Sequence, residues 1–407
     1  MGWLNFEEDS GYYFKDTFIV KKILYLTFYF EPDLCAGSFR NSPLIKELSR
    51  QIEGKAIMDV VTTLPNRYST YQTDAPQYES RGNYDVYRIS IPKHQSGMKD
   101  QVLSFREYYL KTKQHIAGKR YDLVVASSSR LFTAYLGYKI AKRMGAPLYL
   151  DIRDIFTDTM KDVLQNRVVK AFSMPILNRI EQRVFNYAKH INLISGGFKS
   201  YFDKYNKPRY TTFPNGIDDI FLNLPLSVSS NSNPMVITYA GNFGEGQGLH
   251  KIVPEAARLL GDDYKFLLIG DGGAKQKLLN EIEKQDVKNV EIHPPVKRDH
   301  LLEIYSDSDF LFLHLNDYDA FKKVLPSKIF ELGAYDKPII AGVVGFANQF
   351  IEENITNKIL FLPGDVNSMV SRLKAYTYKN VDRKVFKEKY KRANINREMA
   401  KSILQYL

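Results

Sequence analysis

Short apolar runs, each followed by a polar or glycine-containing turn and then by a segment with helical periodicity, recur along this chain. The first is KILYLTF at residues 22–28, which leads through a loop with Gly37 into a helix predicted at 44–51. Strand, turn and helix form the repeating unit of a parallel α/β sheet. Further strands are predicted at 56–62, 85–90, 122–126, 147–152, 191–195, 236–240, 265–269, 290–293, 310–314 and 339–341.

This series is interrupted once, at residues 206–234, where PNG, two aspartates, Pro225 and a Ser/Asn cluster give linker composition. We therefore expect one Rossmann-like domain over 1–205 and a second over 235–380, with a basic helix over 381–407 that packs back on the first. Residues 1–20 resemble an appendage. Doubly wound sheets bind ligands at the carboxyl ends of their strands, which here predicts a site in the cleft between the domains.

The charge and the cysteine content of the chain limit the classes of partner and the cellular compartment that we expect. The 407 residues carry a formal net charge of +11, which favours an anionic partner such as phospholipid headgroups or phosphorylated small molecules. Zinc-type Cys/His spacings, an RNP-like motif and an arginine-rich tail are lacking, which argues against nucleic acid. No apolar run reaches spanning length. The single cysteine, Cys35, and the lack of a signal-peptide pattern at the start predict a cytoplasmic protein.

The stretch LPSKIFELGAYDKPIIAGVV, residues 325–344, combines a helix start with charged residues. Pro326 suits the first turn of a helix, and Ser327 can cap it. The helix start and Lys328 would together attract phosphate, and Glu331 suits a pair of ribose hydroxyls. The alternative is a capped helix with a solvated lysine and glutamate.

Several segments, in this order and spacing, resemble the GT-B-fold glycosyltransferases of family 4. They are FYFEPDLCAGSFR, LDIRDIFTD, FPNGID, YAGNFGEGQGL, LLIGDGG, HPPVKRDHLLEIYSDSDFLFLHL and VLPSKIFELGAYDKPIIAGV. The bacterial O-antigen and capsule enzymes of the WbuB type, which are taken to transfer L-N-acetylfucosamine, are the subgroup most similar to it. The resemblance extends from residue 21 to the end. It implies an α/β protein of two doubly wound Rossmann-like domains that moves a sugar from a UDP- or GDP-sugar to a lipid-linked or oligosaccharide acceptor, without metal or other cofactor and with retention.

The resemblance also implies which residues bind the donor. Glu331 matches the second glutamate of the family's paired-glutamate motif, which holds the ribose, and Pro326 and Ser327 lie where backbone N–H groups meet the diphosphate. In the N-terminal half, Gly37 and Ser38 match a loop that closes over the donor phosphates. Further donor contacts are implied at Gly241, Asn242, Asp271, Gly272, Pro295 and Val296.

The chain departs from the family pattern at several charged positions. Lys323 stands where the first glutamate of the pair belongs, and Gln247 stands where many relatives have a lysine. Because the leaving diphosphate still needs cations or donors, Lys328 is our main candidate, with Arg40 and Lys323 as weaker ones.

Arg153 and Asp154 occupy the place where many relatives have a histidine after an N-domain strand. We expect both at the catalytic site, with Asp154 orienting the acceptor hydroxyl or acting as a weak base. A helix-capping role for Asp154 is the alternative.

Three other features have competing interpretations. Asp307 and Asp309 resemble a metal-binding triplet, but a turn before a buried strand explains them without metal, and we expect none. His293 and His314 end strands and are expected to be structural. The segment 168–184 mixes basic and bulky apolar residues, which predicts either a helix on an anionic bilayer at the inner face of the plasma membrane or an ordinary packed helix.

Two other functions remain open at this stage. A GT-B-fold UDP-N-acetylhexosamine epimerase would need acids and histidines across the cleft, a pattern that the sequence does not show. A non-catalytic sugar-binding component of a polysaccharide assembly complex would explain the missing glutamate and the missing basic residues.

Overall fold

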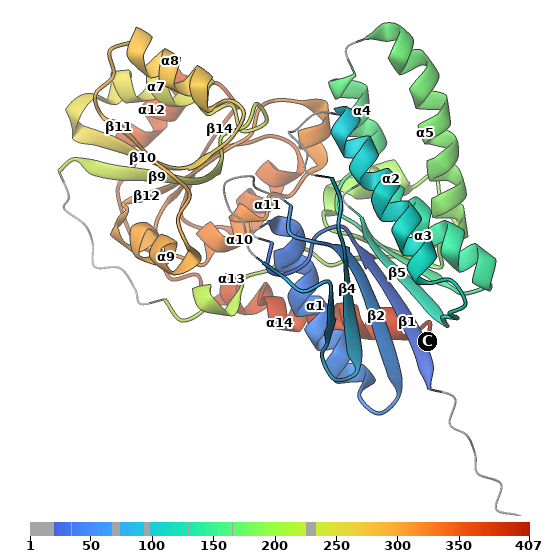
Figure 1. The fold of residues 1–407 in the computed structure, drawn as a ribbon. Coiled ribbons are helices and arrows are strands. Elements are labelled where there is room, and N and C mark those ends of the chain that lie inside the picture. Colours follow the sequence, from blue (N-terminus) through green and yellow to red (C-terminus); the bar gives the residue numbers. More distant parts are fainter. Residues whose placement is uncertain are drawn as a thin grey trace, which may run out of the picture.

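The computed structural model describes two parallel sheets, each covered by helices on both faces (Figure 1). We call the part with the first sheet the N-domain and the part with the second sheet the C-domain. Residues 1–19 of the predicted appendage lie outside the described residues. The described residues are 20–33, 35–66, 74–92, 98–128, 130–164, 166–224 and 233–407.

The described strands of the N-domain sheet follow the order β3-β4-β2-β1-β5-β6-β7-β8. Neighbours are parallel except β3 and β4, which are antiparallel at one edge. Every residue of β5 and β6 is buried, as expected for parallel strands covered on both faces. The strands are β1 (Lys21–Thr27), β2 (Ala56–Thr63), β3 (Tyr78–Ser80), β4 (Tyr84–Ile89), β5 (Leu123–Ser128), β6 (Leu148–Ile152), β7 (His190–Leu193) and β8 (Arg209–Thr212).

Strand β8 corrects the predicted linker at 206–234, because residues 209–212 pair with β7 and extend the N-domain sheet. The sequence RYTT has no apolar run, and three of its four residues are exposed. Nothing in these four residues therefore predicts a strand, and only their pairing with β7 defines one. Residues 225–232 of the predicted linker lie outside the described part.

Alternation along β1 assigns the two faces of this sheet. Leu24 and Leu26 pack with helices α2, α3 and α5, whereas Ile23 and Tyr25 pack on the opposite face with α1 and α14. Two helices, α4 and α5, lie between β6 and β7. The helices are α1 (Ala36–Ile52), α2 (Met98–His115), α3 (Leu131–Met144), α4 (Phe156–Val163), α5 (Arg167–Tyr187) and α6 (Lys199–Phe202).

Helix α1 begins at Ala36, well before the predicted start at 44, and contains Pro43. Proline has no N–H, so the carbonyl of Phe39 loses its helical donor. The guanidinium of Arg392 donates to that carbonyl instead. Arg392 is the first residue of α14 (Arg392–Leu404), so the break in α1 is completed by a residue 353 positions further along the chain.

The C-domain sheet has the described strand order β11-β10-β9-β12-β13-β14. All its pairs are parallel. Helices α9, α10 and α11 cover one face, and α7, α8 and α12 the other. The elements are β9 (Met235–Asn242), α7 (Leu249–Leu260), β10 (Tyr264–Asp271), α8 (Lys275–Lys284), β11 (Val290–His293), α9 (Arg298–Asp307), β12 (Phe310–His314), η4 (Asp319–Lys323), α10 (Lys328–Gly333), β13 (Ile339–Gly342), α11 (Phe346–Asn354), β14 (Lys358–Phe361) and α12 (Val366–Lys374).

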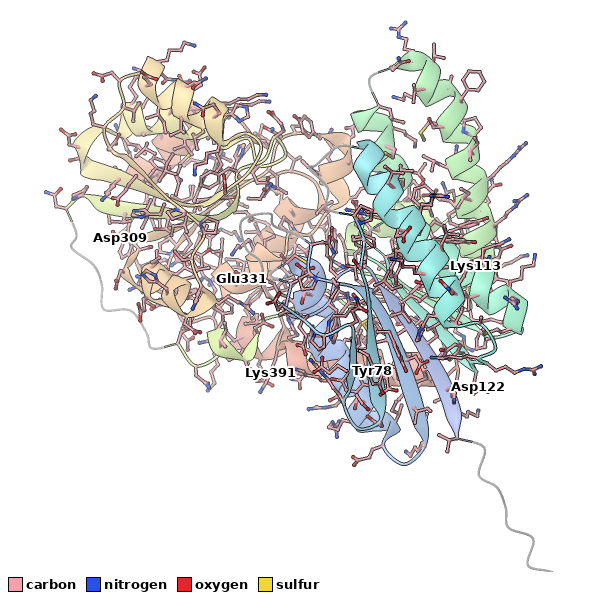
Figure 2. The ribbon with its side chains drawn as sticks, viewed as in Figure 1. Tyr78, Lys113, Asp122, Asp309, Glu331 and Lys391 are labelled. Atoms are coloured by element: carbon pink, nitrogen blue, oxygen red, sulfur yellow. The ribbon has the colours of Figure 1, made fainter. Side chains whose placement is uncertain are left out.

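The last helices cross from the C-domain to the N-domain (Figure 1). After α13 (Lys384–Lys389), residues 390–392 hydrogen-bond with Ile217 of the connecting segment. Helix α14 then packs on α1, and Met399, Ala400 and Ile403 complete the apolar cluster beneath β1. The side-chain view in Figure 2 shows Lys391 at this crossing, between the two sheets.

Candidate functional site

The carboxyl ends of β9 and β10 lie side by side and bring four predicted donor residues together. Gly241 pairs in register with Gly270, and Asn242 with Asp271. A Cβ on Gly270 would lie 1.9 Å from the carbonyl oxygen of Gly241, so only glycine fits between these strands. Gly272 follows directly, and its N–H donates to the Asp271 carboxylate at 2.8 Å.

Two tyrosines connect these strand ends to Lys328. The Tyr239 hydroxyl donates to the Asn242 carbonyl at 2.8 Å, and the Lys328 ammonium lies 5.8 Å from the centre of the Tyr305 ring. The positive charge of Lys328 acts on the pKa of both tyrosines, although burial dominates and raises those pKa values. Lys328 therefore lies close to the predicted donor loop at Gly241.

Lys328 and Glu331 form an ion pair, with Nζ and Oε2 2.6 Å apart. Burial alone would lower the pKa of Lys328, but the Glu331 carboxylate and Tyr305 raise it above its ordinary value. The roles predicted from sequence, phosphate attraction by Lys328 and ribose binding by Glu331, stay predictions, and in this structure the two side chains are each other's partner. Residues at i and i+3 of a helix meet naturally.

Helix α10 itself is only six residues long, from Lys328 to Gly333. Ser327 precedes it but makes no side-chain capping bond, which corrects the predicted cap. Pro326 and Ser327 instead use their carbonyls, which accept the N–H groups of Ile329 and Phe330 at 3.1 Å. Any anion attraction here depends mainly on Lys328, because so short a helix carries few aligned peptide dipoles.

The N-domain contributes the first turn of α1 and the end of β6. Cys35 immediately precedes α1, Gly37 and Ser38 are buried in its first turn, and burial raises the pKa of the Cys35 thiol. A Cβ on Gly37 would lie 3.0 Å from Nη1 of Arg153. The structure therefore brings the predicted residues Gly37 and Arg153 into contact.

Asp154 follows Arg153, and burial raises its pKa from 3.8 to about 6. Its described side-chain contact is with the Thr159 hydroxyl in α4, at a long 3.4 Å. Burial also lowers the pKa of Arg153. A carboxylate with a pKa near neutrality is a reasonable proton acceptor.

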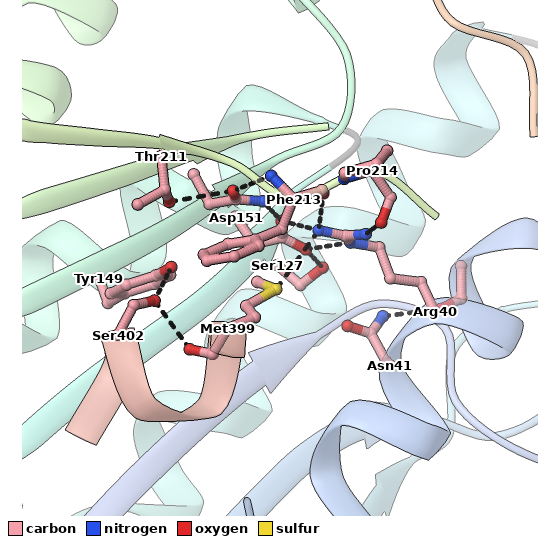
Figure 3. A network of polar contacts seen from close by, with 12 residues as sticks. Arg40, Asn41, Ser127, Tyr149, Asp151, Thr211, Phe213, Pro214, Met399 and Ser402 are labelled. Atoms are coloured by element: carbon pink, nitrogen blue, oxygen red, sulfur yellow. Dashed lines mark hydrogen bonds and ion pairs between the residues drawn. The ribbon is translucent and has the colours of Figure 1, made fainter. Parts of the chain in front are cut away.

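Arg40 is not available as a donor-site cation. Its guanidinium makes two bonds to the buried carboxylate of Asp151, at 2.8 and 2.7 Å, and also donates to the carbonyls of Phe213 and Pro214 (Figure 3). Asn192 completes the set by donating to Asp151 at 2.8 Å. Arg40 thus ties α1 to the connecting segment, which corrects the sequence suggestion.

Lys323 forms an ion pair with Asp158 of α4 and so joins the two domains. Its carbonyl also accepts the Ser195 hydroxyl at 2.6 Å. Gly197 needs to be glycine here, because a Cβ would lie 2.5 Å from that carbonyl oxygen. The residue that replaces the family's first glutamate is therefore held by the opposite domain rather than left free for a diphosphate.

The predicted base-lining residue Val296 packs against the same apolar cluster as Ala240 and Ile329. Its neighbour Pro295 is exposed. Gln247, in the family's lysine position, accepts the amide of Asn242 at 2.9 Å. Val296 follows β11 and Gln247 follows β9, so both lie in loops that leave the carboxyl edge of the C-domain sheet.

His314 is a structural residue, as expected. It is fully buried, its Nε2 accepts the Gly364 N–H at 3.1 Å, and its Nδ1 lies 2.7 Å from the Gln247 carbonyl. Burial lowers its pKa to about 4, so it stays neutral. His293 contacts Glu291 instead.

Asp309 directly precedes β12 and accepts the Val236 N–H at 2.7 Å, which fixes β12 beside β9. Figure 2 shows Asp309 far from Glu331, at the opposite end of the C-domain sheet. The described residues contain no cluster of three His, Cys, Asp or Glu side chains that could hold a metal ion.

Sequence reasoning missed Tyr239, Tyr305 and Asp158, whose roles depend on partners distant in sequence.

A polar hollow of about 670 Å³ against α13 and α14 includes none of the predicted site residues in its lining. Among the described helices, none is long and apolar enough to cross a membrane.

Comparison with known proteins agrees with this architecture. Residues 225–393 match the family model described as Glycosyl transferases group 1, and this segment contains the whole C-domain sheet. Over 97 residues the chain is 32% identical to WcaI of Escherichia coli (strain K12), which is named as a colanic acid biosynthesis glycosyl transferase. That alignment spans 24% of this chain and 24% of the relative.

Solved structures resemble the whole chain. Sucrose-phosphate synthase from Thermosynechococcus elongatus has a TM-score of 0.67 at 12% identity, over 94% of both chains. Anabaena HepE in complex with UDP-glucose has a TM-score of 0.65 at 14% identity, over 94% of this chain and 99% of that one. WaaG, a glycosyltransferase involved in lipopolysaccharide biosynthesis, has a TM-score of 0.59 at 14% identity, over 94% and 96%. The predicted GT-B fold is thereby confirmed.

Proposed function

We propose that the protein is a glycosyltransferase that moves a sugar from a UDP- or GDP-sugar to a hydroxyl of a lipid-linked or oligosaccharide acceptor. One observation carries the proposal. The segment that matches group 1 glycosyl transferases is the one in which Gly241, Asn242, Asp271, Lys328 and Glu331 gather at the ends of β9 and β10 or beside them. Structural neighbours that bind UDP or UDP-glucose support a nucleotide-sugar donor.

Donor binding is assigned to the C-domain. Glu331 would accept the ribose hydroxyls, and Lys328 would turn from Glu331 toward the diphosphate as negative charge develops on it. Only interactions that strengthen in the transition state accelerate the reaction, so the Lys328 contribution should appear in turnover. The reaction is proposed to need no metal and to retain the anomeric configuration, with a donor phosphate oxygen taking the acceptor proton.

Asp154, with its raised pKa, is proposed to orient the acceptor hydroxyl from the N-domain side. Its position beside Arg153, against the first turn of α1, puts it at the carboxyl edge of the N-domain sheet, where ligands of doubly wound folds bind. Donor and acceptor would thus be held by different domains.

The outer face of α5 is proposed to contact an anionic membrane at the inner face of the plasma membrane. Val168, Phe172 and Ile176 are 64%, 75% and 60% exposed. Arg179 and Arg183 continue the same stripe, because steps of three and four residues keep one helix face. Apolar residues beside basic ones suit the surface of an anionic bilayer.

The remaining charges of α5 agree with this orientation. The acidic residue of the helix, Glu181, is 1% exposed and faces the core, where Tyr201 donates to it at 2.5 Å. Lys170, another basic residue of α5, donates to the Lys161 carbonyl at 2.6 Å. The proposed membrane surface therefore relies on Arg179 and Arg183 and not on Lys170.

The cellular role is proposed to be cell-surface polysaccharide synthesis, with an aminosugar or deoxysugar as the transferred group. The WcaI match and the lipopolysaccharide neighbours support it. L-N-acetylfucosamine, the sugar of the WbuB-type enzymes, is the donor sugar to test first. The buried, neutral His314 removes one histidine that an epimerase could use.

The test is incubation of the full chain with UDP- and GDP-linked sugars and a polyprenyl-diphosphate sugar acceptor, with detection of released nucleotide and extended lipid. Acceptor-dependent release that persists in EDTA is expected. Interconversion of free donors without acceptor would instead identify an epimerase. Donor binding without turnover under any condition would favour a non-catalytic sugar-binding protein.

A further inference from the structure

Two arginine side chains lie at the carboxyl edge of the N-domain sheet, close to neighbouring strand ends. Arg153 follows β6 directly, and Arg130 precedes α3 just beyond β5. The Arg153 N–H donates to the carbonyl of Ser128, the last residue of β5, at 2.9 Å. The two residues are therefore held on adjacent strands.

Tyr29 lies between the two guanidinium groups. Its hydroxyl accepts Nη2 of Arg130 at 3.2 Å, and the Arg130 guanidinium lies 4.9 Å from the centre of the Phe28 ring. On its other side, the Cβ of Tyr29 and Nη1 of Arg153 are each 3.0 Å from the place that a Cβ on Gly37 would take. Arg153 thus borders the first turn of α1, and Arg130 is connected to the same place through Tyr29.

Neither arginine forms an ion pair with a carboxylate among the described residues, in contrast to Arg40, which makes two bonds to Asp151. The negative charge of Asp151 acts on Arg153 only from a greater distance. Both side chains are half-buried, and Nη1 of Arg130 and Nε of Arg153 are buried with no hydrogen-bond partner in the described chain. A buried N–H without an acceptor is costly, so two of them on neighbouring guanidinium groups favour an anionic ligand.

We propose that Arg130 and Arg153 form a binding site for the diphosphate group of a substrate. A guanidinium presents a planar fork of donors that matches phosphate oxygens, and two of them on adjacent strand ends suit two linked phosphoryl groups. The proposal rests on the proposed transferase function, because that reaction offers two sources of this chemistry. One is the nucleotide diphosphate of the donor, and the other is the diphosphate of a lipid-linked acceptor.

Gly37 belongs to the same site. Because a side chain there would meet the Arg153 guanidinium and Tyr29 at 3.0 Å, Gly37→Ala should displace Arg153 without removing any charge. It therefore tests the placement of the guanidinium separately from its presence.

The experiment is calorimetric titration of the full chain with two probes, UDP and geranyl diphosphate. The variants are Arg130→Met, Arg153→Met and Gly37→Ala, and Arg143→Met in the last turn of α3 is the control. A charged hydrogen-bonding partner typically contributes a tenfold or greater change in affinity. We expect each site variant to weaken at least one diphosphate probe about tenfold or more and the control to change neither. Whichever probe responds identifies the source.

A purely structural role predicts a different result. Removal of a half-buried guanidinium that has no bonded carboxylate should leave the melting temperature unchanged or raise it, whereas loss of a structural arginine lowers it. Unchanged affinity for both probes in folded Arg130→Met and Arg153→Met proteins would overturn the proposal, even if wild-type binding of UDP upholds the transferase function. A wild-type chain that binds neither probe would overturn both.

Discussion

Lys323 of the C-domain and Asp158 of the N-domain form an ion pair across the domain boundary. Burial alone would raise the pKa of Asp158, but Lys323 and Lys161 hold it below its ordinary value. The pair stands where the family resemblance implies a glutamate that faces the donor. In this chain that position connects the domains instead.

We predict that Lys323→Glu, which places the family residue beside Asp158, separates the domains and weakens donor affinity about fivefold. An exposed or half-buried pair contributes roughly 1 kcal/mol. The double variant Lys323→Asp with Asp158→Lys should recover most of the loss, because it restores the attraction with reversed charges. Small-angle scattering and nucleotide titration measure the two effects. If the double variant behaves like the sum of its singles, the pair has no role in domain closure.

Lys328 and Glu331 should respond differently to substitution although they are paired. Lys328→Met is expected to lower turnover on the order of a hundredfold, about 3 kcal/mol, because its charge acts on the leaving group. Glu331→Gln should mainly weaken donor binding. Steady-state kinetics with nucleotide titration distinguishes the two. Wild-type turnover by folded Lys328→Met would remove this lysine from the reaction.

The pH dependence of Glu331→Gln follows from the same pair. With the carboxylate gone, burial still lowers the pKa of Lys328 and the upward effect of Glu331 is lost, so this pKa moves downward. The variant should therefore lose activity at a lower alkaline pH than the wild type does. A pH–rate profile through the alkaline range checks this shift, and identical profiles would contradict it.

The sequence predicts the central strands of both sheets but not which side chains pair with each other. Runs such as those that became β1, β5 and β12 are recognisable because strands covered on both faces must be apolar throughout. The exposed edge strands β3 and β8 have no such run, and the sequence did not predict them. Lys323 and Asp158 are 165 residues apart, and no local pattern relates them. Of the site, the glycine loops were predicted from the family resemblance, whereas the partners of Lys328 and Arg40 required the fold.

Breaking the buried ion pair of Arg40 and Asp151 should strongly destabilise the N-domain. Burial alone would raise the pKa of Asp151, but Arg40 lowers it. The ion pair therefore stabilises the folded state above the ordinary aspartate pKa, and this stabilisation is lost as the pH falls below that value. Arg40→Met should cost about 3–5 kcal/mol of unfolding free energy, because it leaves a buried carboxylate unpaired. Urea denaturation measures it. Arg40→Met with Asp151→Leu should cost less than the single variant, and a larger cost would contradict this account.

Asp154→Asn should stabilise the protein at pH 7 while it lowers activity. Because the folded pKa of about 6 lies above the ordinary 3.8, the wild type loses stability as pH rises between these values. A shift of two units corresponds to about 3 kcal/mol, which partial solvent contact reduces to roughly 1–2 kcal/mol. Melting temperatures at pH 4 and pH 7 check the prediction. A stability gain that is equal at both pH values would exclude ionisation as its cause.

Replacement of Arg179 and Arg183 by glutamine should reduce binding to anionic vesicles about tenfold or more, since each basic residue near an anionic surface contributes about 1 kcal/mol. Phe172→Ser should reduce binding to both anionic and neutral vesicles. Val385→Ser on α13 is the matched control, because Val385 is also strongly exposed but lies on another helix. Sedimentation with vesicles of each composition gives the result, and equal effects of Phe172→Ser and Val385→Ser would return α5 to an ordinary surface helix.

Helix α14 has a consequence for the order in which the protein is made. Met399, Ala400 and Ile403 close the apolar cluster under β1, and Ser402 contacts the hydroxyl of Tyr149 at 2.8 Å (Figure 3). During synthesis the N-domain, which is made first, therefore keeps part of one sheet face uncovered until residues 399–403 have been added. A chain cut before Met399 would have every strand of the C-domain sheet while the apolar cluster of its first-made domain is still open.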